Sequence, residues 1–188
     1  MPTISIVYFT GSGSTAQLAE AVRQGAASVN GFKTQLLAIS GDDIVKGRYK
    51  NDGVMATLDA SDAIIFGSPT YMGGPAAQFK AFADASVERW FGQAWRDKFA
   101  AGFTISGSPS GDKFSTLQYF QTLAMQHGMI WVGLGEKPTQ PNGVNRLGSF
   151  SGAMAGTGKE SPDGMPSGED KLTGGLLGKR VATLAWKK

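Results

Sequence analysis

The sequence predicts an α/β protein in which a doubly wound, five-stranded parallel sheet carries helices on both faces. Apolar, β-branched runs alternate along the chain with segments of helical periodicity, as expected of repeated β-α units. The runs are nearly continuous in apolar character, which is typical of strands buried on both faces. Three of them lead into turns rich in Gly, Ser and Thr. With 188 residues, we expect a single domain over residues 1–188.

The N-terminal part of the chain is expected to supply two strands and two helices. The run TISIVYF predicts the first strand at Thr3–Phe9. Apolar residues then recur at helical spacing, with Thr15 placed to begin a helix and Gly31 to end it. The run FKTQLLAI predicts the second strand at Phe32–Ile39, and a short helix follows at Gly53–Leu58 after a polar stretch.

The central part is expected to supply three more strands. DAIIFGSPT predicts the third at Asp62–Thr70, and PAAQFKAFADASVERWF predicts one helix with Pro75 in its first turn. KFAAGFTISGS predicts the fourth strand at Lys98–Ser108, and the next helix ends at Gly128. MIWVGLG predicts the fifth strand at Met129–Gly135.

The C-terminal part begins with a long stretch, Glu136–Pro166, that is rich in Gly, Pro, Ser and Asn and has no clear period. Loops of this length are uncommon inside a domain and are usually functional or disordered. A final helix is expected from Ser167, with Asp170 placed as its capping-box partner.

Composition excludes several classes of function. The net charge of +3 is small and the basic residues are scattered, which argues against nucleic-acid binding. No apolar stretch is long enough to span a membrane and no leader-like segment opens the chain, so we expect a cytoplasmic protein. The absence of cysteine excludes disulfides, thiolate metal sites and catalytic thiols. With a single histidine, His127, and no ligand spacing, we expect no metal site.

The turn TGSGST after the first strand is the clearest candidate for a binding site, and a nucleoside triphosphate does not fit it. A triphosphate-binding loop needs a lysine, and none lies between Thr10 and Phe32. A dinucleotide fingerprint is formally present at Gly11, Gly13 and Ala16. However, the second strand ends in LAIS, without the acidic residue that holds an adenosine ribose.

The hydroxyl groups of this turn favour a single terminal phosphate instead. Thr10, Ser12, Ser14 and Thr15 alternate with glycines immediately before a helix. Hydroxyls, unpaired backbone N–H groups and the positive end of a helix together can hold a phosphomonoester without a cationic side chain. FMN carries such a phosphate. An ordinary helix cap explains one of these hydroxyls but not their number.

Two further turns, GSPTYMGG and SGSPSGD, follow the third and fourth strands. Because ligands of doubly wound sheets bind beyond the carboxyl ends of the strands, all three turns are expected to form one site. The residues alone leave three roles open. Tyr71 either stacks on a ligand or is an ordinary loop aromatic, Trp90 packs in a core or lines a pocket, and His127 either caps a helix or acts in the site.

The segments quoted above carry a resemblance to a known family. IVYFTGSGSTAQLAEAV resembles the phosphate loop of flavodoxins, with its apolar pair, aromatic residue and Thr-x-x-Gly-x-Thr pattern. DAIIFGSPTYMGGPAAQFKAF, LAMQHGMIWVGLG and PSGEDKLTGGLLGKRVATLAWK are similar to the WrbA-type branch of flavodoxin-like NAD(P)H:quinone oxidoreductases. The resemblance implies the strand order 2-1-3-4-5 and covers most of the chain. It is thinnest at Gly41–Ser61 and Glu136–Pro166.

The resemblance implies a role for particular residues. It implies an FMN phosphate held by Thr10, Ser12, Gly13, Ser14 and Thr15. It implies an isoalloxazine ring lined by Pro69, Thr70, Tyr71, Met72 and Gly73 and bordered on its other side by Ser106, Gly107, Ser108, Pro109, Ser110 and Gly111. It further implies a catalytic His127 beside the flavin and a substrate pocket formed by Trp90, Tyr71, Met72 and His127. Family members often carry Arg-Phe where this chain has Tyr71-Met72, which bears on the preference for nicotinamide and quinone.

The expected function is therefore two-electron transfer from NADH or NADPH through FMN to a quinone, by a ping-pong mechanism. The resemblance also implies a homo-oligomer and leaves a dimer and a tetramer open. Two alternatives remain: a flavodoxin-type electron carrier without its own NAD(P)H oxidation, and a module that keeps the fold without catalysis. Carriers of that type are usually strongly acidic, which the charge of +3 does not match.

Overall fold

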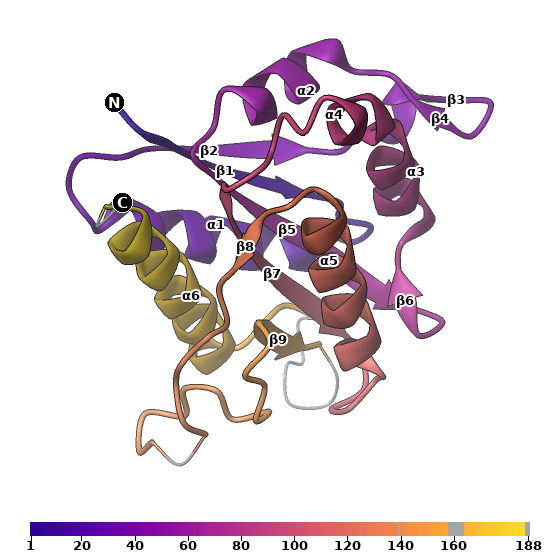
Figure 1. Ribbon diagram of the computed structural model, residues 1–188. Coiled ribbons are helices and arrows are strands. Elements are labelled where there is room, and N and C mark those ends of the chain that lie inside the picture. The colour runs from indigo at the N-terminus through magenta and orange to yellow at the C-terminus, as the bar shows by residue number, and fades with distance from the viewer. Residues whose placement is uncertain (139, 158–163, 187–188) are drawn as a thin grey trace.

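The centre of the protein is a mostly parallel sheet, seen in a computed structural model that describes residues 1–138, 140–157 and 164–186 (Figure 1). The strands run in the order β2-β1-β5-β7-β8, and β9 also pairs with β7. This confirms the predicted doubly wound parallel sheet and its order 2-1-3-4-5. The main strands are β1 (Thr3–Tyr8), β2 (Lys33–Ala38), β5 (Ala63–Tyr71), β7 (Phe99–Ser106), β8 (Ile130–Trp131) and β9 (Ala153–Gly156).

The fifth strand position is filled by two separate segments, which corrects the prediction of one strand at Met129–Gly135. β8 pairs with the first residues of β7, and β9 pairs with its last four. Between them the chain leaves the sheet. In this stretch the backbone of Phe150 lies against Gly133, where a Cβ would be 2.5 Å from the Phe150 oxygen. The stretch Glu136–Pro166 therefore contains a strand that its sequence does not indicate.

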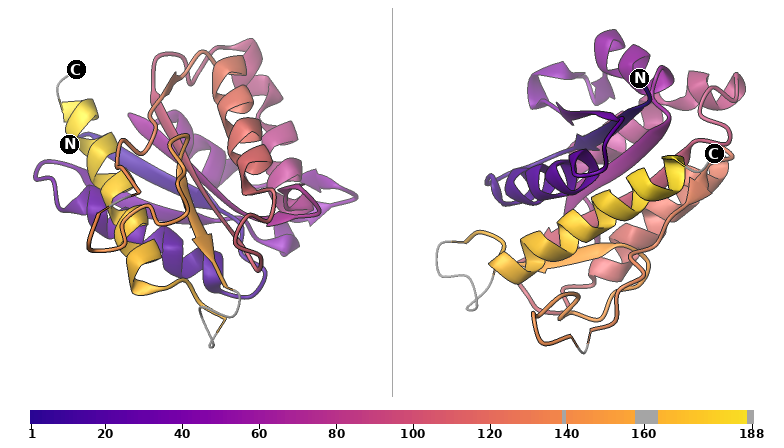
Figure 2. Two further views of the ribbon diagram at one scale, coloured as in Figure 1. Left: turned by 90° about the horizontal axis from the view of Figure 1, so that it is seen from below. Right: turned by 90° about the vertical axis from the view of Figure 1, so that its left-hand side faces the viewer.

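Helices cover both faces of the sheet, as predicted (Figure 2). None of them, within the described part of the chain, is long and apolar enough to cross a membrane. The helix expected over PAAQFKAFADASVERWF is instead two helices that meet at Ser86, and Pro75 belongs to a short strand before them. One face carries α1 (Ser14–Ala27) and α6 (Gly168–Trp186); the other carries α2 (Asp52–Asp59), α3 (Ala77–Ala85), α4 (Val87–Phe91) and α5 (Lys113–Gln126).

The remaining elements are short. A 3₁₀ turn, η1 (Gly41–Asp43), precedes the antiparallel pair β3 (Ile44–Val45) and β4 (Arg48–Tyr49), and β6 (Gly74–Pro75) pairs back on the end of β5. The β3-β4 pair lies in the polar stretch that the sequence left without strands.

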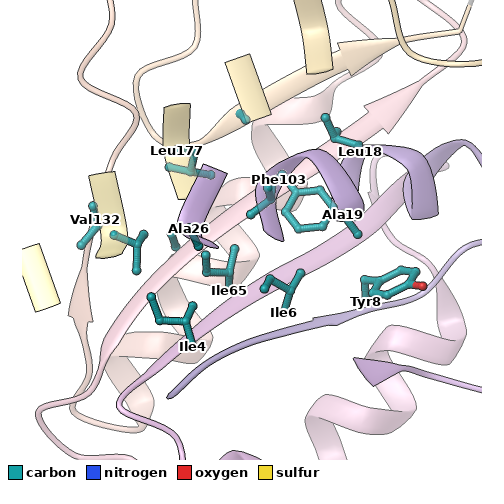
Figure 3. Packing of buried hydrophobic residues seen from close by; sticks show 14 of the residues in the cluster. Ile4, Ile6, Tyr8, Leu18, Ala19, Ala26, Ile65, Phe103, Val132 and Leu177 are labelled. Atoms are coloured by element: carbon teal, nitrogen blue, oxygen red, sulfur yellow. The ribbon is translucent and has the colours of Figure 1, made fainter. Parts of the chain in front are cut away.

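The apolar core has two halves, one on each face of the sheet. On the α1 and α6 face, Ile4 and Ile6 of β1 and Ile65 of β5 meet Leu18 of α1 and Leu177 of α6 (Figure 3). On the other face, a group of phenylalanines from β5, α3 and α5 packs with ring centroids 4.7–6.1 Å apart: Phe66, Phe79, Phe82 and Phe120. Burial on both faces explains why the strand segments read as continuous apolar runs.

Helices α1 and α6 approach each other closely because glycines line their contact. A Cβ at Gly25 would lie 1.8 Å from the backbone oxygen of Gly175, and one at Gly178 would lie 2.0 Å from the oxygen of Val22. Both obstacles are backbone atoms, which cannot rotate away. The packing of α6 on α1 therefore depends on these two positions having no side chain.

We predict that Gly25→Ala lowers the free energy of unfolding by about 2 kcal/mol, as for an overpacked core. The gain in helix propensity, about 1 kcal/mol, is smaller than the cost of separating the two backbones. Urea unfolding measures the change. Gly168→Ala is the matched control, because a Cβ there meets nothing within 4 Å. Equal stability of the two variants would contradict the close contact.

Candidate functional site

Three loops meet at one edge of the sheet and form the candidate site. They are the first loop (residues 9–13, after β1), the second loop (residues 72–73, between β5 and β6) and the third loop (residues 107–112, after β7). Strands β1, β5 and β7 are parallel neighbours, so their carboxyl ends lie side by side. The structure thus brings together the three turns that the sequence singled out.

The first loop ends in a helix N-terminus that no side chain caps. Gly13 is the N-cap of α1 and adopts a left-handed conformation, with φ of 94°, that favours glycine. Thr10 accepts a hydrogen bond of 3.0 Å from the N–H of Gly13, so its hydroxyl closes the loop on itself. Within the described residues no side chain bonds the first-turn N–H groups of α1, and no acidic residue lies in that turn. These N–H groups are therefore available to an anion.

Thr15 carries the most informative hydroxyl of the first loop. Its side chain is fully buried, yet its Oγ1 has no hydrogen-bond partner among the residues that the structure describes. Buried hydroxyls without a partner are rare in folded proteins, because each costs free energy. Together with the uncapped helix N-terminus, this atom fits a phosphate group that completes the loop.

The second loop is a tight hairpin with an exposed side chain at its tip. Met72 and Gly73 both have positive φ, 47° and 75°, and the Met72 side chain is fully exposed. The strand before the tip continues through Pro69 to Tyr71, so Pro69 and Thr70 lie inside β5 and not in a turn. Of the predicted ring-binding segment, the side chains of Tyr71 and Met72 are therefore open to a ligand.

The hydroxyl of Thr70 serves the interior of the protein. Its Oγ1 lies 2.8 Å from that of Thr104 on β7 and 2.8 Å from that of Thr116 on α5. The three groups are buried and join two strands to the helix that follows them. A contact of Thr70 with a flavin, if formed, is therefore left to its backbone.

Tyr71 connects the second loop to the first. A Cβ at Gly11 would lie 2.4 Å from the Tyr71 hydroxyl, so the end of this half-exposed side chain lies directly against Gly11. On the other side, Ser115 of α5 donates a hydrogen bond to the backbone oxygen of Gly73. The hairpin tip is thus held between the first loop and the first turn of α5.

The third loop is held from beneath by Lys113, a residue that the sequence did not single out. The side chain is 1% exposed, and its Nζ donates to Ser106 Oγ at 2.9 Å and to the backbone oxygens of Ser108 and Pro109 at 2.7 and 2.9 Å. Burial lowers the pKa of the amine, and the nearby Asp170 acts in the opposite direction. Gly111 completes the loop with φ of 54°.

Two of the predicted site residues, His127 and Trp90, lie away from the three loops within a single chain, and their role in the flavin site stays a prediction. His127 follows the last residue of α5, whereas the third loop precedes its first, and 14 helical residues separate these ends by about 20 Å. Trp90 lies on α4, which occupies the same far edge of the sheet (Figure 1). A strand that ends at the site starts its following helix there, so the helix ends on the opposite edge.

His127 is a structural residue in this arrangement. It is 1% exposed, its ring lies 4.4 Å from that of Trp95, and its Nε2 is 2.8 Å from Ser86 Oγ. Because the Ser86 hydroxyl donates to the oxygen of Ala83, it accepts from Nε2–H, which assigns the neutral tautomer. The other nitrogen, Nδ1, is buried without a partner among the described residues, and burial lowers the pKa of the ring to about 4.

A buried ion pair supports the third loop from the C-terminal side. Arg146 bonds both carboxylate oxygens of Asp170 at 2.9 Å, and Asp170 also accepts the N–H of Gly156 at 2.9 Å. Ser167 accepts the N–H of Asp170, as predicted, but the carboxylate does not return to cap the helix. It holds the end of β9, which pairs with Ser106 at the start of the third loop.

Fold and site together define a flavodoxin-like protein whose first loop leads into the N-terminus of α1, and comparison with known proteins supports this class. The model of the NADPH-dependent FMN reductase family matches residues 4–137, so the chain belongs to that family. The crystal structure of the flavodoxin, WrbA-like protein from Agrobacterium tumefaciens is 43% identical, with a TM-score of 0.78 over 100% of this chain and 99% of that one.

Two curated relatives carry different names. Flavodoxin FldP from Pseudomonas aeruginosa is 37% identical, over 95% of this chain and 94% of the relative. An NAD(P)H dehydrogenase (quinone) from Archaeoglobus fulgidus is 31% identical, over 100% of this chain and 99% of the relative. The family is thus that of FMN-linked oxidoreductases, while the names of its members divide between carrier and enzyme.

We predict that His127 makes the protein less stable as the pH falls from about 6.5 toward 4. The unfolded chain gains a proton on this ring near its ordinary pKa, while the folded chain takes it only near 4, so acid favours unfolding. The loss amounts to about 3 kcal/mol across that interval. Urea unfolding at pH 7.5 and 4.5 measures it.

His127→Gln is the control for that prediction, because it keeps a donor for Ser86 and has no group that titrates. The difference between the two proteins is expected to appear only in the dependence on pH. Parallel stability curves for both proteins would contradict the assignment of a buried neutral ring.

Proposed function

We propose that this protein binds FMN and transfers two electrons from NADH or NADPH to a quinone. The observation that carries the proposal is the buried, unpaired Thr15 hydroxyl under an uncapped helix N-terminus, at the edge where two more loops meet. The family supports a flavin and a nicotinamide donor, and the relative from Archaeoglobus fulgidus supports a quinone acceptor.

The first loop would hold the phosphate of FMN. We assign the contacts to the N–H groups at the start of α1 and to the hydroxyls of Ser12, Ser14 and Thr15. The hydroxyls of Ser12 and Ser14 lie 3.2 Å apart; Ser12 lies just before α1, and Ser14 is its first residue. The positive end of the helix supplies the charge complement that a side chain provides in other phosphate sites.

The second and third loops would border the ring. The proposed contacts are the backbone at Pro69, Thr70 and Gly73, the side chains of Tyr71 and Met72, and the turn formed by Ser106, Gly107, Ser108, Pro109, Ser110 and Gly111. The hairpin tip and the third loop are held together by Ser115, which also donates to the oxygen of Asp112. The gap between the loops is thus set by hydrogen bonds within the protein.

FMN, when bound, supplies the chemistry by accepting a hydride from the nicotinamide and returning two electrons to the acceptor. The protein binds the phosphate, orients the ring and leaves one side open beside the exposed Met72. We propose that donor and acceptor use that side in turn, which is a ping-pong mechanism. No acid or base of the chain is assigned, since His127 lies at the far edge of the sheet.

The alternative is an electron carrier, which the name of the relative FldP favours. Carriers dock on redox partners through complementary charge, and this chain has a net charge of +3 with scattered basic residues. A carrier would hold FMN by the same first loop. The two functions therefore differ in whether the bound flavin reacts directly with NAD(P)H.

The experiment that tests the proposal mixes the FMN-loaded protein with NADH or NADPH and then with benzoquinone. We expect the visible absorbance of the oxidised flavin to bleach with the nicotinamide and to return with the quinone, with sustained turnover when both are present. Bleaching by dithionite but not by either nicotinamide would instead favour the carrier.

We predict that Thr15→Val lowers the affinity for FMN without lowering the stability of the FMN-free protein. In the FMN-free protein the change removes a buried hydroxyl without a partner, so the free energy of unfolding stays equal or rises by about 1 kcal/mol. FMN affinity falls about tenfold or more, because one hydrogen bond to a charged phosphate is lost. Fluorescence titration with FMN measures the affinity.

Thr173→Val is the matched control for that experiment. Thr173 is equally buried, but its hydroxyl accepts the N–H of Asn145 and donates to the oxygen of Glu169, outside the three loops. This variant is expected to lose stability and to keep its FMN affinity. The opposite pattern for Thr15 and Thr173 would remove the support for a phosphate in the first loop.

A further inference from the structure

Lys113 places a full positive charge directly beneath the third loop. Its Nζ has three hydrogen-bond acceptors, Ser106 Oγ and the oxygens of Ser108 and Pro109. Ser106 Oγ itself donates to the oxygen of Ser108, so it acts as an acceptor toward Nζ. Three acceptors require three N–H donors, which only the ammonium form has. The arrangement of these three acceptors matches the three donors of the ammonium form.

Among the described residues, this charge has no direct counter-ion. Within the ranges 1–138, 140–157 and 164–186, none of the hydrogen bonds of Nζ goes to a carboxylate. The nearby Asp170 already bonds Arg146 through both oxygens. The three acceptors around Nζ are neutral, and they solvate the charge without cancelling it. A field from the ammonium therefore extends through the third loop.

The position of Lys113 in its helix adds to this field. It is the first residue of α5, where the partial positive charge of the helix disfavours a cation. Lys98 shows the ordinary arrangement, since its Nζ donates to the oxygens of Leu58 and Asp59 at the C-terminal end of α2. Lys98 and Lys113 thus both bind backbone oxygens. Lys98 does so at a helix end that favours a cation, and Lys113 at one that disfavours it.

The oxygen contacts also determine which groups the third loop turns outward. The ammonium occupies the backbone oxygens of Ser108 and Pro109. The N–H groups of Gly107 and Ser108 have no acceptor in the described part of the chain, and both residues are exposed. A ligand against this loop meets N–H donors backed by a positive charge, which suits a group that becomes negative.

We propose that Lys113 is a positioning residue of the flavin site, whose ammonium holds the third loop and stabilises the negative charge that a bound flavin gains on two-electron reduction. The inference rests on the proposed function. Transfer of a hydride brings two electrons and one proton to the ring, which gains one negative charge, while the nicotinamide becomes a cation. A fixed positive charge near the ring therefore shifts this equilibrium toward reduction.

The test measures the two-electron midpoint potential of bound FMN and its dissociation constant, by reductive titration with an indicator dye at pH 7. Lys113→Met removes the charge and keeps the length of the side chain, whereas Lys113→Arg keeps the charge. Lys98→Met is the matched control, because it removes the same charge at the opposite edge of the sheet. Unfolding curves show whether each variant is folded.

We expect Lys113→Met to disfavour two-electron reduction about tenfold, which for this couple lowers the midpoint potential by about 30 mV. Lys113→Arg is expected to restore most of the shift, and Lys98→Met to leave the potential unchanged. A folded, FMN-loaded Lys113→Met protein with an unchanged potential would overturn the inference. An equal shift in Lys98→Met would overturn it as well, since the effect would then come from net charge.

The unmodified protein decides the matter if Lys113→Met does not fold or does not bind FMN. We expect its bound flavin to have a two-electron potential above that of free FMN in the same buffer, and a lower potential would overturn the inference. Failure of the unmodified protein to bind FMN would overturn the proposed function itself. The dye titration does not depend on NAD(P)H oxidation. If bound FMN has a raised potential but does not react with NADH or NADPH, the proposed enzyme activity is refuted and the role of Lys113 is supported.

Discussion

Parallel pairing of β1, β5 and β7 is the constraint on which the rest of the structure depends. It aligns the carboxyl ends of three neighbouring strands and so brings together loops that lie about 60 and 40 residues apart in the chain. The pairing holds because both faces of these strands are covered, by α1 and α6 on one side and by α3 and α5 on the other. The glycine contact between α1 and α6 thus supports the site from a distance.

Buried polar contacts make this edge of the sheet rigid. The hydroxyls of Thr70, Thr104 and Thr116 join β5 and β7 to α5 directly behind the second and third loops. The Arg146–Asp170 pair holds the end of β9 against the start of the third loop. The side-chain contacts of these residues lie within the protein and set the distances between the loops.

Several positive groups gather at this edge, together with one carboxylate, that of Asp112 in the third loop. Helices α1 and α5 both begin there, and neither has an acidic residue in its first turn. Lys113 adds a buried ammonium. The edge therefore suits a phosphate at the first loop and a developing negative charge near the third, whereas the strongly acidic surface of an electron carrier is absent from the composition of the chain.

The sequence by itself determined the strands β1, β2, β5 and β7, the Gly-Ser turn before a helix that forms the first loop, and the family resemblance. These features are local, because an apolar run or a Gly-Ser turn before a helix is complete within a few consecutive residues. Only the tertiary structure decided that the fifth strand is split, that Thr70 bonds inward, and that Lys113 lies beneath the third loop. It also placed His127 and Trp90 at the far edge, since a helix carries its last residues away from the site where it begins. Those outcomes depend on which distant segments pack together, and a pattern of a few consecutive residues does not contain that information.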